Sequence, residues 1–234
     1  MKPPCYLFAI LCSLFSLTAS AQKETMRNQP YADLKLYHFG FHIGLQAQDL
    51  ILYHNGKVID KEQWFAEIPS YSPGFSVGVM ADFFMNLYVN FRITPTIHFG
   101  DRNFIFKERY SGELFRTTSR SNYVTLPLDF KFSSMRINNY RPYLLGGIYG
   151  ALDIGRKKGN PILLRQVDYG LTVGLGCDFY LPFFKFCPEL RLAFGIPDLL
   201  ETDRRDLIDR DRDKYTRSLR KATSRMVVFT FYFE

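Results

Sequence analysis

The sequence lacks, after residue 21, any uncharged apolar run long enough for a membrane-spanning helix, which needs about 20 residues. Cysteine is also scarce, because Cys5 and Cys12 lie in the apolar N-terminal stretch and only Cys177 and Cys187 follow it. The chain contains no nucleophile elbow, P-loop, zinc-ligand spacing or dinucleotide fingerprint. We therefore predict a non-enzymatic protein with no catalytic residues, no cofactor and no metal site.

Residues 1–21 have the features of a secretory signal peptide. Lys2 supplies a positive charge, residues 6–17 form a short apolar stretch, and Ala19 to Ala21 provide a small-x-small cleavage site. The alternative, an N-terminal membrane anchor, is disfavoured because the apolar stretch is too short to cross a bilayer. We expect an exported chain.

The formal net charge of +7 is compatible with nucleic-acid binding. An exported chain does not meet nucleic acid, however, so we predict no such partner. The charges concentrate in segments that read as loops, which indicates solvated surface or contact with anionic headgroups or glycans.

The chain is rich in aromatic residues, and in many segments its apolar side chains recur at every second position. Aromatics make up 17% of it, which favours strands. Within residues 168–196, apolar side chains alternate with polar or very small ones, so that one face is apolar and the other polar. The same period recurs at 39–47, 75–83, 89–99, 124–132, 140–153, 169–179, 186–196 and 227–233, although the facing of 140–153 is ambiguous.

The connections between these segments alternate in length, as in an outer-membrane barrel. In lipid, every backbone N–H and C=O must be paired within the protein, so only helices or closed barrels can span. The short connections are 85–86, 133–139 and 181–184, and the longer ones are about 50–73, 100–122, 154–165 and 197–224.

We therefore predict an all-β fold, an eight-stranded antiparallel transmembrane β-barrel over residues 35–234. Its short turns would be periplasmic and its long loops extracellular, with a short periplasmic N-terminal segment at 22–34. The expected location is the cell outer membrane, with both termini periplasmic because the strand number is even.

Aromatic residues flank the predicted short turns, which is the position of an interfacial girdle. The alternative is a soluble β-sandwich or lipocalin-like barrel, whose apolar face would point inward. Few charges fall on the putative inner faces, which disfavours that alternative. The predicted girdle comprises Phe83, Phe84, Phe130, Phe132, Phe179, Tyr180, Phe183, Phe184, Phe231 and Phe233.

The two remaining cysteines fall on opposite faces of their strands. Cys177 lies in the apolar phase and Cys187 in the polar phase. Side chains on opposite faces do not meet disulfide geometry, so we predict two free thiols in the absence of a β-bulge.

Charged residues on the predicted inner faces need partners. Arg92 and Asp129 lie on neighbouring strands, and Glu189 and Arg191 share one face of a single strand. We interpret the set as a charge-paired plug of the lumen, with an ion or proton path, or acid–base catalysis, as alternatives. The predicted network comprises Asp82, Arg92, Asp129, Lys131, Asp178, Glu189 and Arg191, and Lys185 also faces inward.

Three histidines also fall on inner faces: His38, His42 and His98. Metal binding is one interpretation, but their predicted heights are staggered, so we expect hydrogen-bonded interior side chains instead. His98 with Asp101, near the outer rim, is the candidate pair for a lipid-modifying enzyme. The charged run RRDLIDRDRDK at 204–214 is typical of a solvated loop, with partner docking as the alternative.

Several stretches together resemble the PorT family of the Bacteroidetes outer membrane, a part of the type IX secretion system. They are YHFGFHIGLQAQDL (37–50), PGFSVGVMADF (73–83), GDRNFIF (100–106), YVTLPLDFKF (123–132), RINNYRPYLLGG (136–147), DFYLPFFKF (178–186) and FTFYFE (229–234). The similarity covers nearly the whole mature chain, and RINNYRPY and DFYLPFFKF are its more specific parts.

The resemblance implies a role in exporting proteins that carry a C-terminal sorting domain. It implies other outer-membrane or periplasmic secretion components as partners, beside membrane lipids, and it supplies no catalytic residues. The alternatives are a generic small barrel with an adhesive or structural role, and a lipid-modifying outer-membrane enzyme.

Overall fold

The computed structural model describes residues 26–55, 64–67, 73–109, 114–155, 163–201 and 218–234. The predicted signal peptide lies outside these residues and stays a prediction. A 3-10 helix, η1 (Ala32–Leu34), precedes the strands, and no described helix is long and apolar enough to cross a membrane. The strands are β1 (Tyr37–His54), β2 (Trp64–Glu67), β3 (Pro73–Phe84), β4 (Val89–Ile93), β5 (Thr96–Phe99), β6 (Asp101–Glu108), β7 (Leu114–Arg120), β8 (Tyr123–Ser133), β9 (Tyr140–Asp153), β10 (Val167–Tyr180), β11 (Lys185–Gly195) and β12 (Leu219–Phe233).

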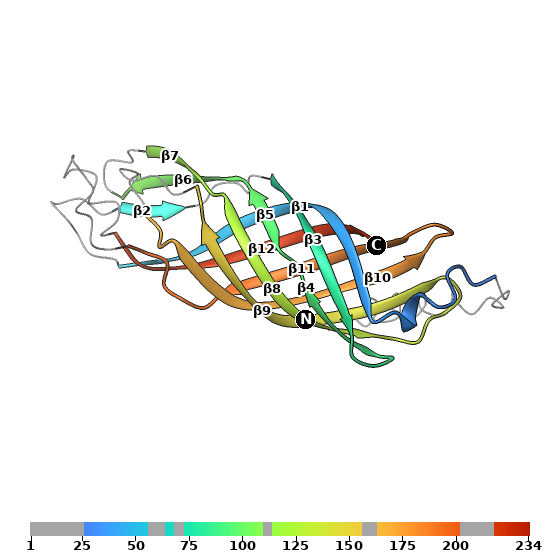
Figure 1. Cartoon of the computed structure of the whole chain (residues 1–234). Coiled ribbons are helices and arrows are strands. Elements are labelled where there is room, and N and C mark those ends of the chain that lie inside the picture. Colours follow the sequence, from blue (N-terminus) through green and yellow to red (C-terminus); the bar gives the residue numbers. More distant parts are fainter. Residues whose placement is uncertain (1–25, 56–63, 68–72, 110–113, 156–162, 202–217) are drawn as a thin grey trace, which may run out of the picture.

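The strands form a closed antiparallel ring (Figure 1). Its order is β1-β12-β11-β10-β9-β8-β4/β5-β3, where β4 and β5 together occupy one position. β1 closes the ring because it pairs along both edges, so that Phe41 lies opposite Val79 of β3 and Phe233 of β12. The predicted eight-stranded antiparallel barrel is confirmed.

The predicted strand at 89–99 is interrupted between β4 and β5. Pro95 has no N–H to donate to the ladder, which explains why the strand assignment breaks there. The register nevertheless continues unchanged, because β3 pairs with both pieces in step. Thr94 N donates to Pro127 O at 3.2 Å, and Val79 N donates to Pro95 O at 3.2 Å.

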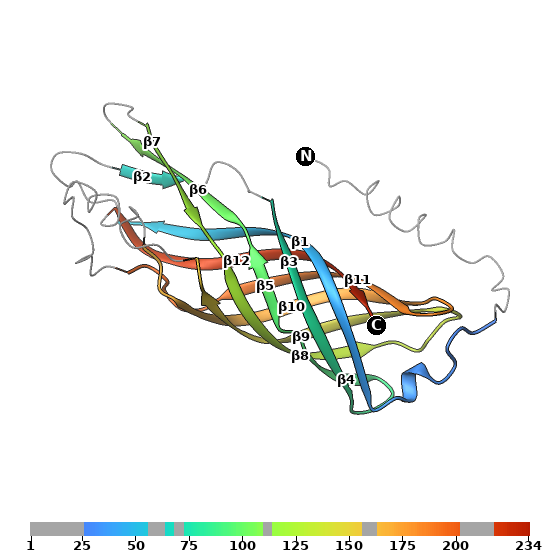
Figure 2. The same ribbon diagram turned by 45° about the horizontal axis from the view of Figure 1, so that its top comes forward.

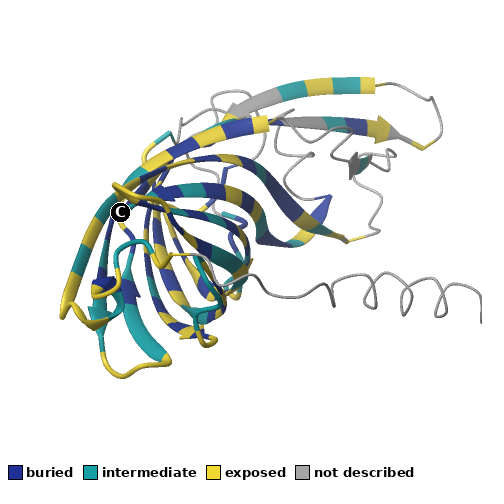
Figure 3. Cartoon of the chain, turned by 90° about the vertical axis from the view of Figure 1, so that its right-hand side faces the viewer, coloured by how far each residue is buried: buried dark blue, intermediate teal, exposed yellow. Residues whose placement is uncertain are grey.

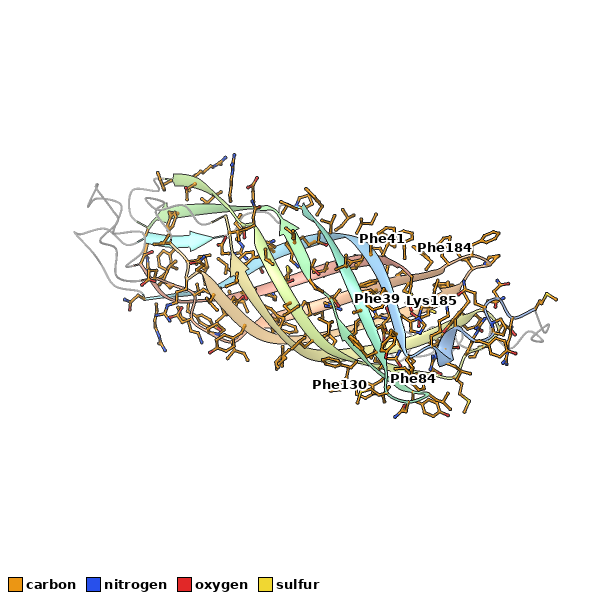
Figure 4. The ribbon with its side chains drawn as sticks, viewed as in Figure 1. Phe39, Phe41, Phe84, Phe130, Phe184 and Lys185 are labelled. Carbon is orange, nitrogen blue, oxygen red and sulfur yellow. The ribbon has the colours of Figure 1, made fainter. Side chains whose placement is uncertain are left out.

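The barrel turns its apolar side chains outward and its polar side chains inward. Along β1, Phe41 and Leu45 are 57% and 62% exposed, whereas His42 and Gln46 are 3% and 4% exposed. Figure 3 shows the same alternation of exposed and buried residues along the strands, and Figure 4 shows side chains projecting from the outer wall. An outward apolar face suits lipid. The alternative of a soluble barrel with an inward apolar face is therefore wrong.

Three predicted loops contain strand structure. The loop predicted at about 50–73 holds the end of β1 and all of β2, the loop at 100–122 holds β6 and β7, and β12 begins at Leu219 inside the loop at 197–224. β2, β6 and β7 form a separate three-stranded sheet at this long-loop end of the barrel (Figure 2). The charged run at 204–214 lies outside the described residues.

An apolar cluster explains why the long-loop end is ordered beyond the barrel wall. There, β6 and the end of β1 pack against two connecting segments, joined by a bridge between Leu164 and Leu200. In this region the apolar side chains are buried rather than exposed to lipid. The pattern of outward apolar residues that identifies the barrel strands therefore does not apply to the strands here. The cluster comprises Leu50, Phe106, Leu164, Leu199, Leu200, Leu219 and Ala222.

The opposite, short-turn end carries the turns at 85–88, 134–139 and 181–184. Phe130 and Phe184, labelled in Figure 4, are 42% and 40% exposed there, as expected of a girdle. Tyr180 corrects that prediction, because it is 1% exposed and points into the barrel. It shares the inward phase of Asp178, two residues earlier, so the alternation itself places it inside.

The cysteine prediction is confirmed. Cys177 and Cys187 are both free, with Cys187 fully buried in the lumen and Cys177 partly exposed. They lie on opposite faces of neighbouring strands, which is incompatible with the short Cβ separation of a disulfide.

Close packing inside the ring predicts that Gly78 tolerates no side chain. A Cβ at Gly78 would lie 2.2 Å from Pro95 O and 2.5 Å from His42 Nε2. We expect Gly78→Leu to lower the free energy of unfolding by about 1–3 kcal/mol, because overpacking forces the backbone apart. Urea unfolding in lipid vesicles, followed by far-UV circular dichroism, measures this effect.

Gly150→Leu is the matched control, since a Cβ at Gly150 meets nothing within 4 Å and the residue faces outward. Equal unfolding midpoints for the two variants would contradict the close approach at Gly78.

Candidate functional site

The seven inward charges predicted from the sequence all lie in the lumen, on strands β3, β4, β8, β10 and β11. Strand alternation places them there, because each is in phase with the small or polar residues of its strand. Their exposed fractions are 1% for Asp82, 0% for Arg92, 0% for Asp129, 2% for Lys131, 1% for Asp178, 1% for Glu189 and 6% for Arg191.

Arg92 is the centre of this network. Its Nη2 lies 2.8 Å from Asp82 Oδ2, and its Nη1 lies 3.1 Å from Glu189 Oε2. Its guanidinium carbon is 5.5 Å from the ring centroid of Tyr143 and 5.1 Å from that of Tyr232, within the range of cation–π attraction. Because β4 and β11 occupy opposite positions in the ring, the ion pair with Glu189 spans the lumen.

Glu189 is saturated with donors on both carboxylate oxygens. Arg191 donates to Oε1 from Nε at 3.1 Å and from Nη2 at 3.0 Å, and Tyr232 OH donates to the same oxygen at 3.2 Å. Tyr143 OH donates to Oε2 at 2.8 Å. Such multiple charge-assisted hydrogen bonds compensate the loss of water around a buried carboxylate.

The remaining charges complete the network. Arg191 Nη2 lies 3.0 Å from Asp129 Oδ2, and Lys131 Nζ lies 2.6 Å from Asp178 Oδ2. Lys131 also sits 4.1 Å from the ring centroid of Tyr143. The structure thus brings all seven predicted charges into ion pairs.

One expected neighbour pair is not used. Arg92 and Asp129 lie directly opposite each other on β4 and β8, but the ion pairs of Arg92 go to Asp82 and Glu189. Asp129 pairs with Arg191 instead and accepts a hydrogen bond from Thr172. The lumen is narrow enough for long cationic side chains to reach strands that are not adjacent.

Sequence reasoning missed the tyrosines that link these charges. Tyr143 and Tyr232 are 3% and 1% exposed and bond to the carboxylate of Glu189. The facing of residues 140–153 was ambiguous in the sequence, so Tyr143 could not be placed inside. The inward phase of Tyr232, which it shares with Thr230, was a usable signal, but the predicted network was limited to charged residues.

The histidines occupy separate hydrogen-bonded positions. His42 Nε2 lies 3.1 Å from Thr96 Oγ1, His98 Nε2 lies 2.9 Å from Thr125 Oγ1, and His38 Nδ1 lies 2.7 Å from Glu234 Oε1. Within the described part of the chain, no group of three or more His, Cys, Asp or Glu residues is arranged to hold a metal ion.

The pair considered for lipid chemistry is not assembled. His98 is 4% exposed, faces the lumen and contacts Gln46 and Thr125. Asp101 is exposed at the start of β6. A small cavity beside His98, also lined by His42, Thr96 and Arg191, lies in the lumen rather than at a lipid-facing rim.

The N-terminal segment before β1 is fastened to the short-turn end of the barrel. Asp33 Oδ1 lies 3.1 Å from Arg141 Nη1 and accepts a hydrogen bond from Tyr180 OH. Asn28 N donates to Asn139 Oδ1 at 2.8 Å, and Arg136 stacks on Tyr180 at 3.7 Å. The stretches RINNYRPY and DFYLPFFKF thus supply the residues that hold this segment.

A second fastening joins the last residue to the same end. Glu234 accepts hydrogen bonds from Lys185 Nζ and from His38, and its backbone pairs with that of Lys185. Burial raises the pKa of the Glu234 carboxyl, but the Lys185 ammonium and the His38 hydrogen bond outweigh burial and hold this pKa well below its ordinary value.

The comparison with known protein families identifies one match. The family described as "Outer membrane protein beta-barrel domain" matches residues 20–201. No curated protein matches the chain.

Similar solved structures include three small membrane proteins. Neisserial surface protein A (NspA) is 10% identical with a TM-score of 0.42, over 85% of this chain and 98% of that one. Ail, the attachment invasion locus protein of Yersinia pestis, in complex with the heparin analogue sucrose octasulfate, is 13% identical with a TM-score of 0.37, over 84% and 97%. Outer membrane protein AlkL is 9% identical with a TM-score of 0.39, over 92% and 95%.

The central position of Arg92 predicts a large effect of its removal. Arg92→Leu leaves the carboxylate of Asp82 buried without its arginine partner and removes one of the two arginines that pair with Glu189, which costs about 3–5 kcal/mol of unfolding free energy. Urea unfolding in lipid vesicles measures the loss. Arg225→Leu is the control, since Arg225 pairs with Asp49 but its side chain is 42% exposed, and we expect a loss of about 1 kcal/mol or less. Equal losses in the two variants would show that the buried ion pairs of Arg92 stabilise the fold no more than the exposed pair of Arg225 does.

The Glu234 fastening predicts a pH-dependent contribution. A carboxyl whose pKa is lowered by folding stabilises the fold above its ordinary pKa of 4.5, and this contribution is lost as pH falls toward the folded-state value. Glu234→Gln should therefore be less stable than the wild type by about 1.5–3 kcal/mol at neutral pH, with a gap that narrows below pH 4.5.

Unfolding midpoints measured across a pH series test this expectation. The control is Asp101→Asn, which removes a carboxylate that is exposed at the long-loop end. A gap for Glu234→Gln that stays constant with pH would contradict the assignment.

Proposed function

The chain belongs to the outer membrane protein β-barrel domain family, and from this premise we propose that it is a non-enzymatic barrel component of the type IX protein secretion system. It acts in the cell outer membrane, in the export of proteins that carry a C-terminal sorting domain. The identity of the system comes from the resemblance of RINNYRPY, DFYLPFFKF and the other stretches to the PorT family.

The observation that supports a component role, rather than a channel role, is the filled lumen. Arg92 is fully buried and forms an ion pair across the ring with Glu189, between the rings of Tyr143 and Tyr232. Cargo therefore does not pass through this barrel. Its contribution to export comes from its outer wall and its two ends, by holding or assembling other secretion components.

The short-turn end is the proposed periplasmic face, with both described chain ends located there. The N-terminal segment is fixed to it through Asp33, Arg141 and Asn139. This gives the end a defined surface for outer-membrane or periplasmic partners, while the apolar outer wall contacts lipid.

A second candidate is a generic small barrel with an adhesive or structural role. It is supported by the sheet of β2, β6 and β7, which extends beyond the barrel wall at the long-loop end (Figure 2). For the lipid-modifying alternative, His98 and Asp101 would have to act together at the rim, and His98 is instead bonded to Thr125 inside the lumen.

Deletion of the gene tests the secretion role. We expect proteins bearing the C-terminal sorting domain to disappear from the culture supernatant and to accumulate in the periplasm, as measured by quantitative proteomics of both fractions. Complementation with the wild-type gene should restore them. Outer-membrane proteins without the sorting domain serve as the internal control and should keep their levels. An unchanged supernatant would refute the secretion role and favour the adhesive or structural candidate.

A further inference from the structure

The segment that precedes β1 lies across the short-turn mouth of the barrel. It joins the wall where β1 begins, at Tyr37, and it contacts Asn139 and Arg141 at the start of β9. β1 and β9 occupy opposite positions in the ring. Residues 26–35 therefore pass from one side of the ring to the other, toward the tips of the short turns (Figure 2).

Two side chains of the turn at 134–139 recognise the main chain of this segment. Arg136 Nη1 donates to Gln29 O at 3.2 Å, and its Nη2 donates to Asn28 O. The Asn139 amide accepts from Asn28 N at 2.8 Å and donates to Met26 O at 3.0 Å. Main-chain hydrogen bonds of this kind give affinity for an extended peptide, whatever its side chains.

Two amide side chains of the segment add contacts to the turn at 181–184. Asn28 Nδ2 donates to Tyr180 O at 3.0 Å, and Gln29 Nε2 donates to Leu181 O at 2.9 Å. Gln29 has a φ of 48°, in the left-handed region that residues other than glycine seldom adopt. Contacts with the turns hold this backbone in place, so the bound conformation is imposed by the site.

A carboxylate of the segment completes the contacts, five residues after Asn28. Asp33 Oδ1 lies 3.1 Å from Arg141 Nη1 and accepts a hydrogen bond from Tyr180 OH. Asp33 Oδ2 lies 3.8 Å from Arg136 Nη1. Two arginines and a tyrosine hydroxyl thus form a receptor for one acidic side chain.

The segment resembles a bound peptide more than a part of the wall. Among residues 26–35, Ala32 alone is buried, so polar contacts rather than an apolar core hold the segment. The Asp33 side chain is 23% exposed, so its ion pairs lie at the surface. The ring closes without the segment, because the pairs of β1 with β3 and β12 begin at Tyr37 and Phe41.

We propose that the short-turn end carries a peptide-binding site, which the chain's own residues 26–35 occupy as an intramolecular ligand. An extended segment of another protein takes their place when it carries an amide side chain and, five residues later, a carboxylate. Arg136 and Asn139 bind its main chain, and Arg141 and Tyr180 bind its carboxylate. This inference does not depend on the role in secretion.

Binding of a defined peptide to the purified full-length mature chain in detergent micelles tests the proposal. The probe is a fluorescent peptide with the sequence of residues 26–35, MRNQPYADLK. In the wild type the attached segment competes at an effective concentration on the order of millimolar. The double variant N28A/D33A weakens this competitor and leaves the turns intact. Fluorescence anisotropy should therefore show that the probe binds the double variant about tenfold or more tightly than the wild type.

Matched controls separate recognition from non-specific attachment. The double variant R27A/K35A changes two exposed positions of the same segment and should bind the probe as weakly as the wild type. A probe that carries N28A and D33A should not bind the N28A/D33A chain. Adding Arg136→Ala to that chain should abolish binding of the parent probe, because the main-chain contacts are lost.

Exchange is measured directly on a chain that keeps the contacts of Asn28 and Asp33. A spin label at Arg27→Cys, in a Cys177→Ala background, reports on the attached segment, since Arg27 is exposed and Cys187 is fully buried. Millimolar unlabelled probe should increase the mobility of the label in its electron paramagnetic resonance spectrum, and the N28A/D33A probe should not.

The proposal is overturned by any of three results on chains whose folding is verified by far-UV circular dichroism. The first is that the probe binds the N28A/D33A chain no more tightly than it binds the wild type. The second is that binding persists with the substituted probe or with Arg136→Ala, which would indicate non-specific attachment. The third is that the spin label at residue 27 is unaffected by the parent probe, which would make the segment a permanent part of the wall.

Discussion

Every other feature of this protein depends on the need to pair the backbone within the chain. A strand in lipid has no water to satisfy its N–H and C=O groups, so the sheet must close on itself. β1 achieves this closure by pairing with β3 and with β12, the first and last partners along the chain. Closure of so few strands leaves an interior just wide enough for side chains. The lumen is therefore a core, although its lining is polar.

A polar core raises the problem of buried charge, and the structure solves it by combining partners. Isolated ion pairs seldom repay the loss of hydration, whereas a network in which each oxygen has a donor does so more fully. Glu189 illustrates this, since arginine and tyrosine donors from several strands converge on its two oxygens. The same contacts tie β4, β9, β11 and β12 together across the lumen, beyond the neighbour-to-neighbour ladder. The same network of ion pairs and hydrogen bonds therefore both fills the lumen and makes the wall rigid.

The sequence predicts the strands of the barrel wall better than it predicts the side-chain contacts inside the lumen. The two-residue period reports which face each side chain takes, and this was sufficient for the ring, for the inward charges and for the free thiols. It does not report which strands meet across the lumen, so the partner of Arg92 was found only in the structure. Tyr180 was misassigned because its residue type suggested the interface while its phase placed it inside. β6 and β7 were missed because, beyond the lipid, the apolar side chains turn toward a local cluster.

A barrel with a filled lumen differs from a channel in which of its residues can change without loss of the fold. Ion pairs such as Arg92 with Glu189 fix the interior, so variation that leaves the fold intact is confined to the two ends and to the lipid-facing surface. At the short-turn end, Asp33 and Arg141 bind the N-terminal segment to the wall, which makes that end a rigid surface. At the other end, β2, β6 and β7 form a three-stranded sheet of their own beyond the barrel wall. Since the interior offers no path, any partner must be recognised at one of these two surfaces or along the outer wall.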